Sequence, residues 1–358
     1  MLGQNAPIPL MITILLLLSL IIAGCSSAAP SAETPQPSEQ PDATTVAEQP
    51  TAQASPTAQA SPTASSTPSA VPTADTWSYE ANLKLFDYDQ SAPLDLQSVV
   101  KEEKQEITIH DISYASPKGG RVTGYLIVPE GPGPFAGVIM QHGSPGSRDS
   151  LRGYAEELVK TGAVALLIDA PFTRRDGRFM AFGQRDYDEQ IQFMVDLRRG
   201  VDLLQSRPDV DPERIGYIGY SYGAALGGLL AGIEKRIKAF VFAAGDGGLV
   251  EHYSYPTPAN DVSALVPSEM FESWKVLMDP IEPIRFVAHA APSALLYQNA
   301  RNDSLVNSES AKRYQEAGSQ PKEIIWYNTD HGLSSQAFRD QINWLSQYIG
   351  IDPQKYKW

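Results

Sequence analysis

The chain has 358 residues, a formal net charge of −14 at pH 7 and a sequence pI of about 4.8. This acidic balance argues against a nucleic-acid partner, because a protein that neutralises phosphates needs a basic face. The chain contains one cysteine, Cys25, which excludes an intrachain disulfide, so the fold must depend on its hydrophobic core.

The N-terminal segment contains an apolar, leucine-rich run over residues 8–22. This is the length of a signal-peptide core and is short of the ~20 residues that span a bilayer. The run ends in Ile-Ala-Gly-Cys at 22–25, which resembles the bacterial lipobox, whose cysteine is diacylated before cleavage. We therefore predict a lipoprotein signal peptide over residues 1–24 and Cys25 as the lipidated N-terminus. The mature protein would be anchored to the membrane in the bacterial cell envelope, facing outside the cytoplasm. Because no Lys or Arg precedes the run, an uncleaved anchor or a plain secretory signal stays an alternative.

Residues 25–75 are almost wholly Ala, Ser, Thr, Pro, Gln and Glu, and residues 51–56 are closely repeated at 57–62. Such a composition cannot form a core. The prolines favour an extended, semi-rigid tether, and an unstructured spacer would differ little physically. We predict a disordered linker here and one domain over residues 76–358, which is long enough for a buried core.

The globular part begins with two alternating segments and continues with short apolar runs. Residues 105–114 and 121–128 alternate apolar and polar side chains, as half-buried antiparallel strands do. The apolar runs are typical of strands covered on both faces and lie at residues 135–140, 163–168, 215–218, 238–243, 293–297 and 323–327. Helical patterns lie between them at residues 149–160, 186–205, 223–231, 308–316 and 335–348. This alternation predicts an α/β fold with a mainly parallel, eight-stranded sheet flanked by helices.

A long connection separates the runs at 238–243 and 293–297. Its roughly fifty residues exceed an ordinary loop, and connections of this length are usually functional or have structure of their own. It contains several aromatic residues and prolines, and residues 267–277 could form a helix. We predict a cap insertion over about residues 246–290 that covers the active site. A lid that only covers the sheet is the alternative.

The strongest motif is Gly-Tyr-Ser-Tyr-Gly at 219–223, directly after a predicted strand and before a helical pattern of small residues. Glycines on both sides of the serine relieve the crowding of a strained strand-to-helix turn, which lifts the serine hydroxyl above the sheet. This setting predicts that Ser221 is a nucleophile rather than a structural turn residue.

A serine hydroxyl needs a base within hydrogen-bond reach. His331 follows the last predicted strand and precedes the last helix, so it belongs to the same carboxyl edge of the sheet as Ser221. The other histidines are more easily interpreted as surface, packing or loop-shaping residues: His110, His142, His252 and His289. We predict His331 as the base.

The base needs an acid that holds its tautomer. Asp303 follows the strand at 293–297, and the order Ser, Asp, His with the acid after the penultimate strand is the usual layout. We predict Asp303 as this acid, with Asp246, at the end of the preceding strand, as the alternative. Asp330, next to His331, is predicted to be a turn residue.

Attack on a carbonyl places negative charge on its oxygen, which two backbone N–H groups should receive. One is predicted from Tyr222, the residue after the nucleophile. The other is expected from the loop His-Gly-Ser-Pro-Gly at 142–146, with Ser144 as the donor and Gly143 as the alternative. This chemistry requires no metal and no organic cofactor.

Together these motifs resemble the α/β-hydrolase superfamily, in particular its dienelactone-hydrolase-like and acetyl-xylan-esterase-like members, over residues 106–349. Dienelactone hydrolase proper has a cysteine nucleophile, and the serine here implies a different activity. The resemblance implies a serine esterase that cleaves a small-molecule or glycan ester through an acyl-enzyme. Prolyl-oligopeptidase-like peptidases share the catalytic domain, so a serine peptidase is one alternative. A non-catalytic binding lipoprotein with the same fold is the other.

Overall fold

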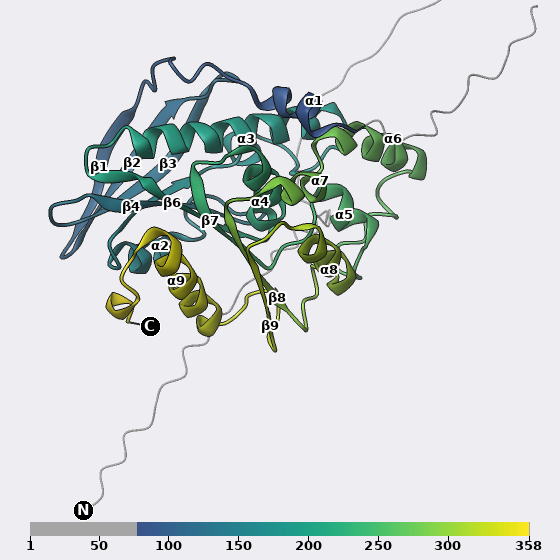
Figure 1. Ribbon diagram of the computed structural model, residues 1–358. Helices are drawn as coiled ribbons and strands as arrows, with labels where there is room; N and C mark the ends of the chain where they lie inside the picture. Colours follow the sequence, from purple (N-terminus) through teal and green to yellow (C-terminus); the bar gives the residue numbers. More distant parts are fainter. Residues whose placement is uncertain (1–76, 358) are drawn as a thin grey trace, which may run out of the picture. The chain divides into compact units, whose positions relative to one another are not determined.

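The computed structural model describes residues 77–357 (Figure 1). The predicted signal peptide, Cys25 and the predicted linker lie outside the described residues. Within the described part, no helix has the length and apolar character needed to cross a membrane.

The centre of the described domain is a nine-stranded sheet with the order β1-β2-β3-β5-β4-β6-β7-β8-β9. The strands are β1 (Gln97–Lys104), β2 (Ile107–Ala115), β3 (Arg121–Pro129), β4 (Phe135–Gln141), β5 (Ala163–Ile168), β6 (Val210–Tyr220), β7 (Ile237–Ala243), β8 (Ala294–Ala300) and β9 (Lys322–Tyr327). Strands β4 to β9 pair in parallel, whereas β1, β2, β3 and β5 are antiparallel neighbours. The parallel strands therefore end at one common edge. The predicted mainly parallel sheet is confirmed.

The predicted number of eight strands is wrong by one, and the additional strand is β1. Seven of its eight side chains are exposed and the eighth is only half-buried. An edge strand without a buried face has no alternation of apolar and polar residues, which is the signal that identified β2 and β3. Val99 and Val100, the most apolar residues of β1, both face solvent.

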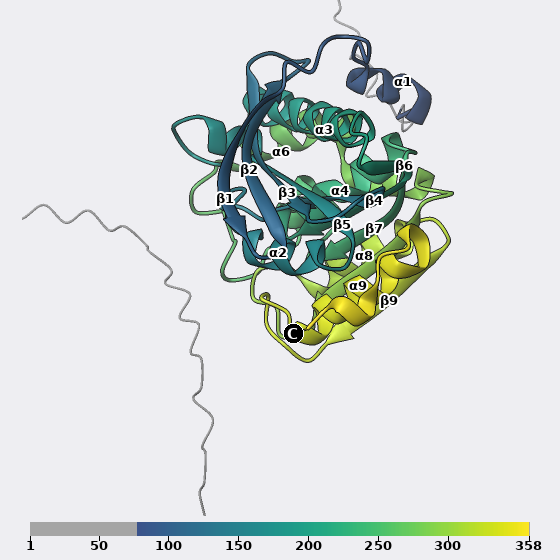
Figure 2. The same ribbon diagram turned by 90° about the vertical axis from the view of Figure 1, so that its left-hand side faces the viewer.

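Helices cover both faces of the sheet (Figures 1 and 2). One face carries α3 (Gln184–Gln205), α4 (Tyr222–Ile233) and α8 (Ser308–Ala317), and the other carries α2 (Arg152–Val159) and α9 (Ser335–Ile349). Successive side chains of strand β7 point to opposite faces of the sheet and so enter different apolar clusters. Phe240 and Phe242 belong to the apolar cluster with α3 and α4, whereas Val241 belongs to the cluster with α2 and α9.

The connection between β7 and β8, predicted as a cap, consists of short helices. They are α5 (Leu249–Ser254), α6 (Ser268–Met278), η3 (Asp279–Ile281), α7 (Pro283–Phe286) and η4 (Val287–His289). The helix expected at 267–277 is α6. It is fixed by Trp274, which is fully buried and packs edge-on against Phe182 at a ring-centroid distance of 5.1 Å. The insertion is therefore tied to the segment that precedes α3.

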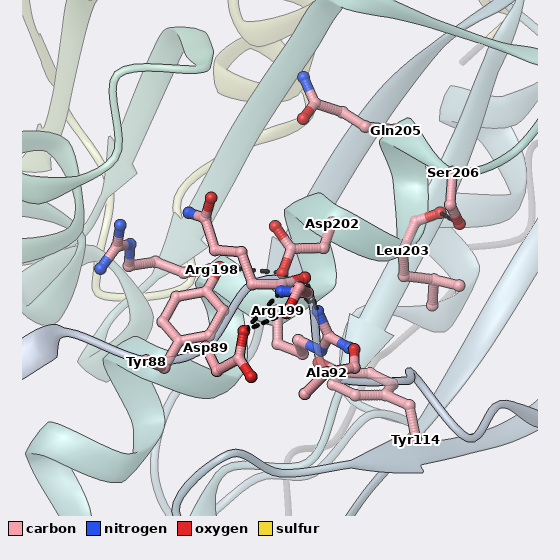
Figure 3. A network of polar contacts seen from close by, with 12 residues as sticks. Tyr88, Asp89, Ala92, Tyr114, Arg198, Arg199, Asp202, Leu203, Gln205 and Ser206 are labelled. Carbon is pink, nitrogen blue, oxygen red and sulfur yellow. Dashed lines mark hydrogen bonds and ion pairs between the residues drawn. The ribbon is translucent and has the colours of Figure 1, made fainter.

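The first described residues form a strap along α3 that contains α1 (Tyr79–Leu83) and η1 (Lys84–Phe86). Figure 3 shows the polar contacts that hold it. Arg199 is buried and donates to the carbonyl oxygens of Gln90 and Ala92. Asp202 accepts from the Tyr88 hydroxyl at 2.9 Å and also pairs with Arg199 at 2.9 Å. Irregular backbone can lie against a core helix here because side chains satisfy its carbonyl groups.

Replacing Arg199 by Met should lower the free energy of unfolding by about 1–3 kcal/mol. The carbonyl groups of Gln90 and Ala92 would lose the donor that holds the strap, and Asp202 would lose one of its partners. Urea unfolding followed by circular dichroism measures this change. The control is Lys238→Met, which breaks the exposed pair with Glu213 and should cost at most about 1 kcal/mol. Equal effects of the two substitutions would contradict the structural role of the strap contacts.

Candidate active site

The turn between β6 and α4 holds Ser221 in an unusual conformation. Ser221 has φ 53° and ψ −114°, a region that costs a non-glycine residue about 1–3 kcal/mol and persists only where the surroundings impose it. The surroundings do so from both sides. The Ser221 N–H donates to the carbonyl of Ala243 on β7 at 2.8 Å, and the Ser221 carbonyl accepts from Ala225 N–H in α4 at 2.9 Å. The serine is thus fixed at the carboxyl edge of the sheet.

Three glycines make room for this turn. A Cβ at Gly223 would lie 2.5 Å from the carbonyl oxygen of Gln141, and a Cβ at Gly219 would collide with the backbone of Gly223. On the facing loop, a Cβ at Gly143 would lie 2.9 Å from the Cβ of Ser221. Each of these contacts is too short for any side chain, so the glycines in both motifs are required by close packing around the serine.

The structure brings Ser221, His331 and Asp303 together in one hydrogen-bonded chain. His331 lies between β9 and α9, and its Nε2 is 3.0 Å from the Oγ of Ser221. Its Nδ1 is 2.8 Å from Oδ2 of Asp303 and 3.0 Å from Oδ1. Both loops follow parallel strands at the same edge of the sheet. This is the geometry of a nucleophile, a base and an acid that orients the base.

Asp303 is built to stay ionised. Burial alone would raise its pKa, but the hydrogen bond and charge of His331 and the backbone N–H groups of Leu305 and Val306 lower it. The net pKa lies below the ordinary value. An ionised Asp303 accepts the Nδ1 proton of His331, which leaves Nε2 free to accept a proton from Ser221.

Tyr220 supports the base and was not singled out as a site residue from the sequence. Its hydroxyl donates to the backbone carbonyl of His331 at 3.0 Å, and the two rings lie 5.4 Å apart. Burial, with a smaller contribution from Asp303, raises the pKa of Tyr220 to about 12, so the hydroxyl stays a donor. Asp330 accepts from the N–H of Gly332, as a turn residue does.

A small cavity of about 50 Å³ opens in front of Ser221. Ser144 and Tyr222, the predicted oxyanion donors, line it together with Ser221. Tyr222 is the first residue of α4, and an N–H in the first turn of a helix has no partner within that helix. The other lining residues are Phe179, Ala225, Gly245, Asp246, Leu249, His252, Tyr253 and Val306. Several of them belong to the β7–β8 insertion.

The remaining histidines differ in their surroundings. His142 is buried and accepts from Ala170 N–H at 3.2 Å, which suits its predicted loop-shaping role. His252 was interpreted as a surface or packing residue, and its ring packs edge-on against Tyr253 at a centroid distance of 5.0 Å. It lines the cavity, and its Nδ1 lies 2.9 Å from Oδ2 of Asp246. Asp246, the alternative acid, thus has a histidine partner other than His331.

No group of three or more His, Asp or Glu side chains within residues 77–357 is arranged to hold a metal.

A mostly parallel sheet with a serine in the turn after one strand and a histidine after the last defines an α/β-hydrolase fold. The chain belongs to the dienelactone hydrolase family, whose family model matches residues 122–343.

Solved structures agree with this fold. The acetyl xylan esterase from a Paenibacillus species shares 18% sequence identity, with a TM-score of 0.63 over 75% of this chain and 93% of that chain. Acetyl xylan esterase 1 from a Thermoanaerobacterium species shares 14%, with a TM-score of 0.62 over 78% of this chain and 94% of that chain. At these identities the likeness shows the fold.

The curated relatives are matched over only part of their own length. An uncharacterised peptidase of Bacillus subtilis is 23% identical over 67% of this chain and 38% of its own length. Acyl-coenzyme A thioesterase 3 of Mus musculus is 24% identical over 64% of this chain and 56% of its own. The chain spans less than two thirds of the length of the curated relatives it matches.

The lowered pKa of Asp303 predicts a pH-dependent contribution to stability. Because the folded-state pKa is below the ordinary value of 3.8, the contribution is fully present well above that value and is lost as the pH falls through the folded-state pKa. The difference in unfolding free energy between the protein and Asp303→Asn should therefore be constant between about pH 6 and about pH 5 and shrink as the pH falls below about 4. Urea unfolding at each pH measures it, with the exposed Asp330→Asn as control. A difference that is constant or grows on acidification would contradict the assignment.

Proposed function

We propose that this protein is a hydrolase, namely a serine esterase that cleaves a carboxylic ester, with Ser221 as nucleophile, His331 as base and Asp303 as the orienting acid. The observation that carries the proposal is the hydrogen-bonded chain of these three residues, with distances of 2.8 Å and 3.0 Å on the two sides of the imidazole. The strained backbone of Ser221 supports it, because such strain concentrates at functional sites.

The proposed reaction has two halves. In the first, His331 Nε2 takes the Ser221 proton as Oγ attacks the ester carbonyl carbon, and the resulting oxyanion is stabilised by the N–H groups of Tyr222 and Ser144. The intermediate collapses to an acyl-enzyme as His331 protonates the departing alkoxide. In the second half, His331 deprotonates a water that attacks the acyl carbon. His331 then returns the proton to Oγ of Ser221 as the bond between Oγ and the acyl carbon breaks and the carboxylic acid leaves. Asp303 stabilises the imidazolium in both halves, and no step uses a metal or an organic cofactor.

The substrate is proposed to be a small-molecule or glycan ester. The cavity next to Ser221 is small, about 50 Å³, which favours a short acyl group. Two proteins of the same fold are acetyl xylan esterases by name. A peptidase is the second candidate, since one curated relative is named an uncharacterised peptidase and the same three residues could cleave an amide. The hydrogen-bonded triad counts against a non-catalytic binding protein.

Ser221→Ala should lower kcat/KM for 4-nitrophenyl acetate by about 10⁴-fold or more, because the nucleophile is removed while the fold is kept. Ser346→Ala on α9, whose hydroxyl bonds only to a backbone carbonyl, is the matched control and should retain the wild-type rate. A matched 4-nitroanilide measured in parallel separates the candidates. Faster cleavage of the anilide than of the ester would favour the peptidase, and undiminished ester hydrolysis by Ser221→Ala would refute the serine mechanism.

We also propose, from the sequence pattern alone, that residues 1–24 are removed and that Cys25 anchors the protein to the membrane of a bacterial envelope, outside the cytoplasm. A lipid-anchored serine hydrolase on a linker would act at the cell surface or in the periplasm. In bacteria fed a clickable palmitate analogue, the wild-type protein and Ser27→Ala should incorporate the label, whereas Cys25→Ala should not. Label retained by Cys25→Ala would exclude lipidation at this cysteine.

A further inference from the structure

Asp246 is a buried carboxylate in the wall of the cavity that contains Ser221. It follows β7, is only 1% exposed and lines this cavity. Its Oδ2 pairs with Nδ1 of His252 at 2.9 Å, whereas no group within residues 77–357 donates a hydrogen bond to its Oδ1. Oδ1 is not among the buried polar atoms left without a partner, so it is open to the cavity, and the proposed reaction does not use it. A ligand that filled the cavity would have to offer this oxygen a donor or pay for covering it. Oδ1 of Asp246 can therefore bind a group on a ligand, and the triad mechanism does not account for it.

His252 fixes Asp246 in this position. The side-chain amide nitrogen of Asn260 lies 2.9 Å from Nε2 of His252 and also donates to the carbonyl of Leu305, while the amide oxygen accepts from Thr257 N–H. The contacts with Leu305 and Thr257 set the orientation of the Asn260 amide, so its NH2 group points at Nε2 of His252. Nε2 therefore accepts a hydrogen bond, and the ring proton is on Nδ1. Burial lowers the pKa of His252, but Asp246 more than offsets this and the net pKa is raised. Nδ1 carries a proton in either state, so His252 always donates to Asp246.

The cavity receives the acyl side of the substrate. The leaving-group oxygen must lie beside Nε2 of His331, from which it takes its proton. His331 does not line this cavity, whereas Ser144 and Tyr222, the two proposed oxyanion donors, do. The acyl substituent lies on the opposite side of the carbonyl carbon from the leaving group, so it extends into the cavity toward Asp246.

The acyl cavity has apolar walls from Phe179, Ala225, Leu249 and Val306, and Tyr253 also lines it. A plain alkyl chain would cover Oδ1 of Asp246 without offering it a donor. A carboxylate can only accept, so the group that satisfies it must carry a proton to donate. We infer that Asp246 is a specificity-determining residue that hydrogen-bonds a hydroxyl group on the acyl chain, and that the preferred substrates are esters of short hydroxy acids. This inference rests on the proposed ester hydrolysis at Ser221.

The test compares esters matched in shape. For the purified protein, kcat/KM is measured with 4-nitrophenyl 3-hydroxybutanoate and 3-methylbutanoate, and with 2-hydroxypropanoate and 2-methylpropanoate. In at least one pair the hydroxy ester should be preferred by about 10²-fold or more, because a site built to bind a hydroxyl rejects the analogue that lacks it. Asp246→Leu should abolish the preference. Asp246→Asn keeps the size and an acceptor for His252, and should reduce the preference at least about tenfold by removing the charge-assisted bond.

The ratio of two esters does not depend on the amount of folded enzyme, so a purely structural role of Asp246 would leave it unchanged. Asp261→Asn, an exposed cap residue, is the control and should keep the wild-type ratio. Ratios near one in both pairs, or a preference that survives Asp246→Leu, would overturn the inference. So would a preference for the 3-aminobutanoate ester over the hydroxy ester, which would assign an ammonium group instead. If the inference about Asp246 fails but Ser221 is still required for hydrolysis of the acetate ester, the esterase proposal stands. If no ester is hydrolysed, the esterase proposal and the inference about Asp246 are both overturned.

Discussion

The backbone of Ser221, strained at φ 53° between β6 and α4, is the constraint on which the site depends. It turns the chain so sharply that Gly219, Gly223 and Gly143 cannot carry side chains. In return, one turn serves two purposes: it raises Oγ above the sheet edge and starts α4 at Tyr222, whose N–H is then available beside the nucleophile. The nucleophile and one proposed oxyanion donor are therefore set by the same few backbone angles.

The parallel arrangement of β4 to β9 supplies the other groups. Each strand ends at the same edge, so the loops after β4, β6, β7, β8 and β9 meet there although they are far apart in sequence. Two Asp–His pairs result. Asp303 with His331 serves the serine, and Asp246 with His252 faces the cavity from the insertion after β7. The first pair suits proton transfer, and the second suits selection of what the serine acts on.

The sequence was sufficient for the parts of the site that follow directly from strand position. Ser221, Asp303 and His331 each come after an apolar run, and the common edge of parallel strands implies that they meet. It was insufficient where orientation depends on packing. His252 lies on the short helix α5 in a long connection, and its partner is decided by how Trp274 and the rest of the insertion seat on the domain. Strand β1 was missed for another reason, because an exposed edge strand leaves no apolar pattern.

The central claim is that Ser221 is the nucleophile, and covalent trapping tests it most directly. The purified protein is treated with a fluorophosphonate, which reacts with serines activated by a neighbouring base, and is then digested and mapped by mass spectrometry. The account predicts one adduct, on the peptide that contains Ser221, with hydrolytic activity lost in proportion to labelling. An adduct on a different residue, or full activity in protein labelled at Ser221, would contradict it.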